Sequence, residues 1–424
     1  MLDRTRPPAI YHIDRLHLPQ PLLHYLDNGI PVYDTRINTQ DVLKIELVFQ
    51  AGRPQESKKL VARATAGLLK DGAGELDGAA IAEAIDFYGG TLNIPSGMDG
   101  VNLVFYCLSK HLPSVLPVLS EIILKPTFPQ HELEAYVQRH LQNLKIDLSK
   151  PDIVAYRNIT EMIFGESHPY GYNSLPEHYA ALTREDLQAH HQAWYHSGNC
   201  MIFICGKTDD QTVRLLNQYF GKMPAGISAG VPFFPAPPEK PLPKKHFPHA
   251  EAVQTAVYIG RRMFPRNHPD YCGMYVLNTL LGGYFGSRLM TNIREEKGYT
   301  YNILSMLDTM QTDGWFYVGT EVGNEFTGRT ITEIYSEMEM LRKEPVDKEE
   351  MDMVRNYLMG GFLTMIDGPF NVSEVVRTLI TESLPLDFFE QWVNKVANIT
   401  PDELQALAKK YLDPADMWEV AVGG

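Results

Sequence analysis

The sequence predicts an α+β protein built from two homologous domains, each a mostly antiparallel sheet with helices packed against it, like half of a clam shell. Two observations lead to this prediction. A proline-rich segment divides the 424 residues into two nearly equal parts, and short blocks recur in both parts at one constant offset. Strand and helix patterns also mix without strict strand–helix–strand alternation, which is typical of α+β proteins.

The dividing segment covers residues 224–249 and reads PAGISAGVPFFPAPPEKPLPKKHFPH. Its eight prolines exclude a helix and favour an extended, semi-rigid linker. Residues 1–223 are therefore expected to form the first domain, and residues 250–424 the second.

The two halves share matched blocks. Thr183 corresponds to Thr400, and Glu132 corresponds to Glu349, so both pairs are separated by 217 residues. Each threonine precedes a helical pattern and is followed three residues later by an acid, which is the arrangement of a capping box. One offset shared by separate blocks indicates an internal duplication.

Strand and helix patterns can be assigned along the first half. Apolar strand patterns cover residues 26–35, 42–52 and 101–109. Apolar residues at helical spacing predict helices over residues 58–71, 81–90 and 112–125. The first of these helices is the one on which the functional argument depends.

Composition and charge exclude some classes of function. Hydrophobic residues make up 44% of the chain, but no run of eighteen apolar residues predicts a membrane span. The net charge of −14 argues against nucleic acid as a partner, because binding to phosphates needs a positive surface. The four cysteines form no CxxC pair, so we expect reduced thiols and a cytoplasmic protein, or a periplasmic one if a leader has been removed.

The order of motifs along the chain points to one family. A hairpin ends in AGRPQES, a helix leads to KDGAG, and a second helix ends in DFYGGTLNIPSGMDG. LTREDL follows, and later a glycine-rich turn precedes NIREEKGYTY. This order resembles the pitrilysin, insulin-degrading enzyme and mitochondrial processing peptidase family over nearly the whole chain, including the duplication.

Active members of that family carry HxxEH on the first helix of the first half. Its histidines bind zinc, and its glutamate acts as general base. Laid on this motif, Arg63 falls at the first histidine, Ala66 at the glutamate and Gly67 at the second histidine. The downstream acidic ligand falls near Asn143. The sequence thus predicts no metal and no other cofactor in this chain.

No other zinc motif replaces the missing one. Neither HxxEH nor HExxH occurs among the fourteen histidines. His190, His191 and His196 form the densest cluster, but their spacing does not place them on one helix face. We interpret them as exposed or locally hydrogen-bonded histidines.

The second half contains a different candidate site. In the family, a segment with the pattern RxxxGxxY supplies an arginine and a tyrosine that face the zinc across the substrate chamber. By resemblance these are Arg294 and Tyr301, an arginine suited to hold a peptide carbonyl and a tyrosine suited to support an oxyanion. The alternative is that Arg294 pairs with Glu295 or Glu296 and that Tyr301 is an ordinary strand residue.

A glycine-rich turn precedes this pair. No P-loop lysine follows the turn, so phosphate binding is not favoured. We interpret it as a tight turn that forms a loop touching the substrate. Its glycines are Gly282, Gly283 and Gly286.

The resemblance implies a protein that is half of an enzyme. It would be the non-zinc-binding subunit of a two-chain peptidase that acts on peptides, with the zinc in a homologous partner bearing HxxEH. Alone it is expected to be inactive. A purely structural or binding subunit, resembling the core proteins of a respiratory complex, is the alternative, and an autonomous hydrolase with another site is the third hypothesis.

Overall fold

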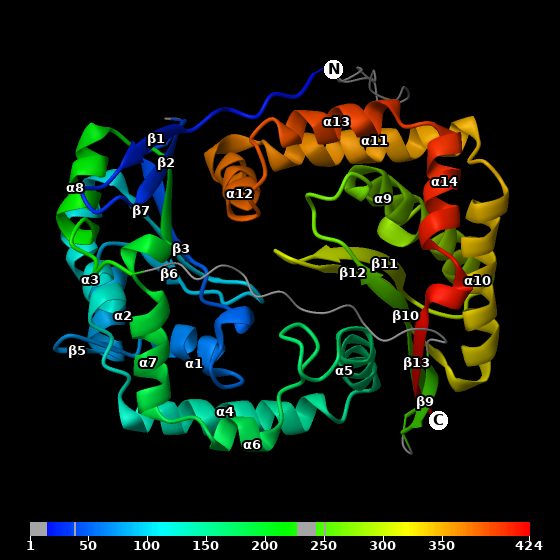
Figure 1. Cartoon of the computed structure of the whole chain (residues 1–424), viewed down its shortest axis with the longest axis horizontal. Coiled ribbons are helices and arrows are strands. Elements are labelled where there is room, and N and C mark those ends of the chain that lie inside the picture. Colours follow the sequence, from blue (N-terminus) through cyan, green and yellow to red (C-terminus); the bar gives the residue numbers. More distant parts are fainter. Residues whose placement is uncertain (1–14, 38–39, 227–242, 250–251) are drawn as a thin grey trace, which may run out of the picture.

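A computed structural model describes residues 15–37, 40–226, 243–249 and 252–424, and two sheets organise them (Figure 1). The first sheet contains β1 (Leu22–Tyr25), β2 (Pro31–Arg36), β3 (Val42–Phe49), β6 (Thr91–Asn93), β7 (Val101–Leu108) and β8 (Cys200–Gly206). The second contains β9 (Lys244–Pro248), β10 (Gln254–Met263), β11 (Ile303–Thr309), β12 (Gly314–Gly323) and β13 (Trp418–Gly423). A small separate ribbon pairs β4 (Gly72–Ala73) with β5 (Leu76–Asp77).

The two sheets match strand by strand. The order β2-β8-β3-β7-β6 in the first corresponds to β9-β13-β10-β12-β11 in the second, and β1 is an addition at one edge. In each sheet one equivalent pair is parallel, β2 with β8 and β9 with β13, and the other pairs are antiparallel. The predicted α+β fold with two homologous halves is confirmed.

Helices pack around these sheets. In the first half they are α1 (Val61–Leu68), α2 (Gly78–Asp86), α3 (Leu112–Leu124), α4 (Gln130–Asp147), α5 (Pro151–Phe164), α6 (Pro176–Ala180), α7 (Arg184–Trp194) and α8 (Asp210–Phe220). In the second half they are α9 (Tyr271–Asn278), α10 (Thr327–Lys343), α11 (Lys348–Met365), α12 (Gly368–Thr381), α13 (Phe388–Asn398) and α14 (Pro401–Tyr411). Among the described residues, no helix combines the length and the apolar character needed to span a bilayer.

The predicted capping boxes begin two equivalent helices. The Thr183 hydroxyl accepts a hydrogen bond from the backbone N–H of Asp186 at 3.2 Å, at the start of α7. The Thr400 hydroxyl accepts one from the N–H of Glu403 at 3.2 Å, at the start of α14. These caps satisfy backbone donors that a helix leaves unpaired at its N-terminus.

Each half lends one helix to the sheet of the other half. Figure 1 shows α4 leading along one side of the molecule to α5, and α11 leading along the opposite side to α12. Helix α5 packs against β10 and β13 of the second sheet, whereas α12 packs against β2 and β8 of the first. The two halves are therefore joined through these two helices, an exchange that the duplicated sequence alone does not reveal.

The two exchanged contacts differ in chemistry. The α5 contact is apolar, because Ala155 and Ile159 share one buried cluster with Ala256 and Val420. Burying such apolar surface stabilises the contact without any requirement for charge pairing.

The α12 contact instead contains a buried ion network. Lys44, in the centre of β3, is 0% exposed and forms ion pairs with Glu46 at 2.8 Å and with Glu374 of α12. The Nε atom of Arg377, also on α12, lies 3.1 Å from Glu46 Oε1. Every charge in this network has a partner of opposite sign, which offsets the cost of removing it from water.

The predicted linker includes part of the second sheet. Residues 244–248, which were assigned to the linker 224–249, form β9 and pair with β13. Pro243 precedes this strand and Pro248 is its last residue, and the strand lies at the edge of the sheet, where proline is tolerated. Residues 227–242 of the predicted linker lie outside the described residues.

The ion network yields a prediction about stability. Replacing Lys44 by methionine leaves the buried carboxylate of Glu46 with Arg377 as its remaining cationic partner, so we expect the free energy of unfolding to fall by about 3 kcal/mol. Lys207→Met is the matched control, because Lys207 pairs with Asp41 at the exposed surface, where loss of an ion pair changes stability little. Chemical denaturation measures both. Equal, small losses would show that the network does not stabilise the joined halves.

Candidate functional site

The positions that correspond to a lost zinc site lie on α1 and α4, which pack together. Arg63 and Gly67 are one helical turn apart on α1, and both are exposed, whereas Ala66 is buried in the core of the first half. Asn143 lies on α4, and it lines the same cavity as Arg63. The structure thus brings Arg63 and Asn143 together, and Ala66 has become a packing residue.

Tyr136 of α4 takes up space beside the position of the second histidine. A Cβ atom at residue 67 would lie 3.0 Å from Cε2 of Tyr136, closer than ordinary van der Waals contact. The Tyr136 ring is buried, and burial raises the pKa of its hydroxyl to about 12. Packing therefore explains the glycine at position 67: it leaves room for an aromatic ring where a metal ligand would stand.

His140 is the one histidine that lines this cavity among the described residues. Its ring lies 4.1 Å from the ring centre of Tyr136. Burial, and then the charges of Arg63 and Arg139, lower the pKa of His140 to about 4. The imidazole is consequently neutral at pH 7, and the charges around it are cationic.

These residues do not fit a zinc ion. Structural and catalytic zinc sites need three or four His, Cys, Asp or Glu ligands in a compact group. Within the described residues, no group of three or more such side chains is placed to hold a metal ion. Of the predicted histidine cluster, His190 Nε2 hydrogen-bonds to the carbonyl oxygen of Ala51 and His191 Nε2 to that of Ile123, as expected for locally satisfied rings.

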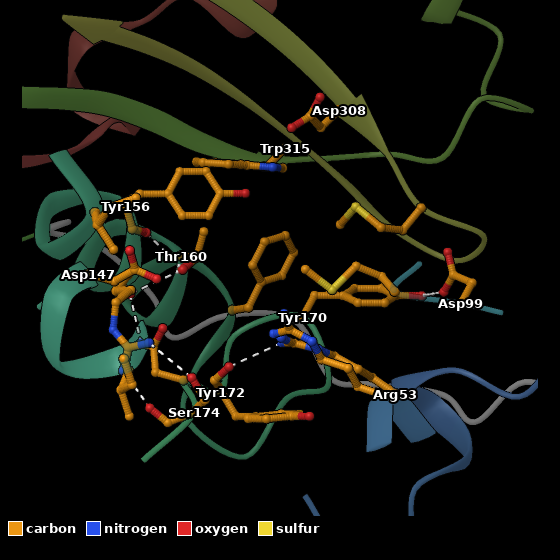
Figure 2. Close-up of a pocket in the computed structure, with 18 of the residues that line it drawn as sticks. Arg53, Asp99, Asp147, Tyr156, Thr160, Tyr170, Tyr172, Ser174, Asp308 and Trp315 are labelled. Atoms are coloured by element: carbon orange, nitrogen blue, oxygen red, sulfur yellow. Dashed lines mark hydrogen bonds between the residues drawn. The ribbon is translucent and has the colours of Figure 1, made fainter. Parts of the chain in front are cut away.

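A cavity of about 590 Å³ lies against this position, between the two halves. The first half contributes α1, α4, α5 and the segment after α5, and the second half contributes β11, β12 and the turn between them. Figure 2 shows aromatic side chains on several sides of it. The aromatic residues in its lining are Tyr156, Phe164, Tyr170, Tyr172, Tyr179 and Trp315.

A carboxylate and an arginine tie the cavity's lining together. Asp99 accepts hydrogen bonds from the Tyr170 hydroxyl and from the backbone N–H of Gln311, the latter at 2.9 Å, so it links the two halves. Burial raises the pKa of Asp99. Arg53 stacks on the Tyr172 ring, with its guanidinium carbon 4.3 Å from the ring centre. This part of the lining is held by its own polar contacts.

Four rings form a wall that joins this cavity to a second hollow. Tyr156 of α5 contacts Trp315, Tyr317 and Tyr258 at centroid distances of 5.5, 6.3 and 5.9 Å. We call these four residues the aromatic wall. Trp315 lines the main cavity, and Tyr258 and Tyr317 line a groove of about 290 Å³ that also includes Tyr301. The wall exists because α5 crosses from the first half onto the second sheet.

Tyr301 lies at this groove with its side chain free of the sheet. It is 89% exposed, and β11 begins two residues later, at Ile303. The Thr300 hydroxyl donates a hydrogen bond to the Glu321 carbonyl oxygen at 2.7 Å and holds the preceding segment against the sheet. The alternative interpretation, an ordinary strand residue, is therefore wrong for Tyr301.

Arg294 occupies a π-helical turn, Met290–Glu296. Its guanidinium carbon lies 4.7 Å from the ring centre of Phe285, a cation–π contact. Among the described residues, no ion pair joins Arg294 to Glu295 or Glu296, and no hydrogen bond or ring contact joins it to Tyr301. Phe285 is 59% exposed and was missed by the sequence analysis, although an apolar residue between glycines marks it.

The predicted glycine loop has two parts. Gly282 is buried at the end of a π-helical turn, Thr279–Gly283, and a Cβ atom there would lie 2.5 Å from the backbone nitrogen of Ser305. Gly282 therefore permits close packing on β11. Gly283 and Gly286 are exposed on either side of Phe285, so the accessible loop consists of residues 283–286.

Two family models match the chain. The model described as "Insulinase (Peptidase family M16)" matches residues 35–167, and the one described as "Peptidase M16 inactive domain" matches residues 181–358. Together they span most of the sequence. The chain belongs to peptidase family M16. Its second model is that of an inactive M16 domain, and the first half lacks the HxxEH ligands.

Relatives within M16 carry both kinds of name. The "uncharacterized zinc protease YmxG" of Bacillus subtilis (strain 168) is 22% identical over 290 residues, which cover 68% of this chain and 69% of that protein. The "non-peptidase homolog YmxG" of Helicobacter pylori is 22% identical over 385 residues, covering 88% of this chain and 87% of that protein. The loss of peptidase chemistry thus has a named parallel among M16 relatives.

Solved structures share the fold. A structure described as the peptidase M16 inactive domain from Pseudomonas fluorescens superimposes with a TM-score of 0.87 at 23% identity, over 95% of this chain and 98% of that one. The periplasmic protease PqqL of Escherichia coli gives a TM-score of 0.78 at 16% identity, and the match covers 99% of this chain but 49% of PqqL. This M16 chain therefore has the length of half of PqqL.

The site yields a prediction about metal. Because Arg63, Gly67 and Asn143 replace ligands and Tyr136 takes up nearby space, the purified chain should retain no stoichiometric zinc after dialysis and should cleave no peptide. Metal analysis and a peptide-hydrolysis assay, each with and without added zinc, measure this. One zinc per chain that is lost in a His140→Ala variant would contradict it.

Proposed function

We propose that this M16 chain is the non-zinc-binding subunit of a two-chain peptidase, whose homologous partner bears HxxEH and holds the zinc. One observation carries the proposal. The M16 fold is retained, but Arg63 and Tyr136 stand at the position of the metal site. Tyr301 nevertheless is 89% exposed, at a groove that shares the aromatic wall with the main cavity. Tyrosine is enriched at binding interfaces relative to the rest of a protein surface.

Tyr301 is proposed to act on the reacting carbonyl of a bound peptide. When bound in the partner, zinc supplies an activated water. The Tyr301 hydroxyl donates a hydrogen bond to the oxygen on which negative charge develops, and so stabilises the transition state. Its backbone is held in place by Thr300, whose hydroxyl donates to the carbonyl oxygen of Glu321, so little reorganisation accompanies this contact.

Arg294 is proposed to hold the substrate rather than the reacting atoms. Its guanidinium is stacked on Phe285 and has no carboxylate partner among the described residues, so its N–H groups remain available for peptide carbonyl oxygens. The loop 283–286, with Phe285 between two exposed glycines, supplies an apolar surface beside it. Arg294 and Phe285 together provide a polar and an apolar contact for a peptide.

The proposal predicts separate effects for the two residues. In the complex with the zinc-bearing partner, Tyr301→Phe should lower kcat by roughly 10²- to 10³-fold, because one oxyanion donor is lost. Arg294→Ala should chiefly raise KM, because it removes binding shared by the ground state and the transition state. Peptide hydrolysis is measured beside an assay of subunit association.

Matched controls separate a local effect from a general one. Tyr25→Phe removes a hydroxyl from a tyrosine that is 66% exposed on β1, far in the fold from β11. Arg329→Ala removes an exposed arginine from α10. Neither control should change hydrolysis. Wild-type kinetics for both Tyr301→Phe and Arg294→Ala, with association intact, would favour a structural or binding subunit instead.

A further inference from the structure

Arg63 differs from the other arginines that line the main cavity. Arg53 donates a hydrogen bond to the Tyr172 carbonyl oxygen at 3.2 Å, and Arg157 donates one to the Ser174 carbonyl oxygen at 2.7 Å. Arg63 forms no hydrogen bond and no ion pair within the described part of the chain, although it lines the same cavity. Its guanidinium is therefore available to a ligand that enters the cavity.

Two uncharged donors line the same cavity as Arg63, whose charge is close enough to lower the pKa of one of them, His140. His140 and Asn143, one turn apart on α4, both line the cavity, and neither is hydrogen-bonded among the described residues. Because His140 is neutral at pH 7, its ring carries one N–H that can donate. The Asn143 amide carries two more. A charged guanidinium beside neutral N–H donors is an arrangement that favours a carboxylate.

The carboxylates that line the cavity do not compete for this position. Asp99 is bound to the backbone N–H of Gln311, and Asp147 pairs with Lys150 at 3.1 Å. Burial raises the pKa of Asp308, which lies on β11 in the other half. An incoming anion therefore finds Arg63 unneutralised.

We propose that the main cavity binds a peptide through a carboxylate, held by Arg63, His140 and Asn143 at the position where the family's zinc would stand. The aromatic residues of the cavity, among them Tyr156 and Trp315, then receive an apolar side chain of the same peptide. A cationic side chain thus takes the place of metal ligands, and the former metal site becomes a site for an anion. This binding needs no partner subunit, so it stands apart from the function proposed above.

The test compares three N-acetylated tripeptides with the isolated full-length chain by titration calorimetry. The first ends in phenylalanine with a free carboxylate, the second is its C-terminal amide, and the third is an amide with glutamate before the phenylalanine. We expect the acid to bind roughly tenfold more tightly than its amide. Arg63→Gln should abolish this preference, and Arg63→Lys should retain part of it.

Arg139→Gln is the matched control. Arg139 is an exposed arginine on α4 that is close enough to lower the pKa of His140 but does not line the cavity. Its loss should leave the preference for the acid intact. Thermal unfolding of each variant verifies that the fold is retained, and the exposed position of Arg63 makes loss of folding unexpected.

Each outcome decides the proposal. If only the peptide with the free C-terminal carboxylate binds tightly, the cavity recognises a peptide C-terminus. If the glutamate-containing amide binds equally well, the cavity also accepts side-chain carboxylates. Equal affinities of acid and amide for the wild-type chain, no binding of any of the three peptides, or a preference that survives Arg63→Gln would each overturn it. None of these results depends on hydrolysis by a two-chain complex.

Discussion

The reciprocal exchange of α5 and α12 is the constraint on which the rest of this structure depends. Each helix is covalently part of one half and packs on the sheet of the other, so neither sheet has its full cover without the opposite half. Sheets need a covered apolar face to be stable. The exchange thus holds the two halves at one relative position, and it also places Tyr156 against the second sheet, where it completes the aromatic wall.

Duplication has left the two exchanged contacts unequal. The α5 contact is an apolar interface, whereas the α12 contact surrounds the buried ion network of Lys44 and Glu46. Apolar contacts tolerate small shifts, but buried ion pairs require precise geometry to offset desolvation. The ionic contact therefore fixes how α12 sits on the first sheet, and the main cavity lies beside the apolar one.

The loss of the metal position is a coordinated change rather than the deletion of single ligands. Arg63 brings a positive charge to the place of a cation's ligand, and Gly67 leaves room for the Tyr136 ring. His140 loses its proton readily because burial and neighbouring arginines oppose its charge. Together these residues replace a cation-binding site with a site suited to an anion. Tyr301 and Arg294, on the other half, are untouched by this change.

The duplication, the absent HxxEH ligands and the capping boxes at Thr183 and Thr400 were determined by the sequence itself, because each is a local pattern of residue types. The accessible loop at Phe285 was only partly foreseeable: glycines mark a turn, but burial separates Gly282 from its neighbours. The exchange of α5 and α12, the pairing of β9 within the expected linker and the gathering of Arg63 and Asn143 at one cavity were decided by tertiary structure. An apolar helix face carries no mark of which sheet it will cover, since hydrophobic burial is non-directional and long-range contacts select the partner.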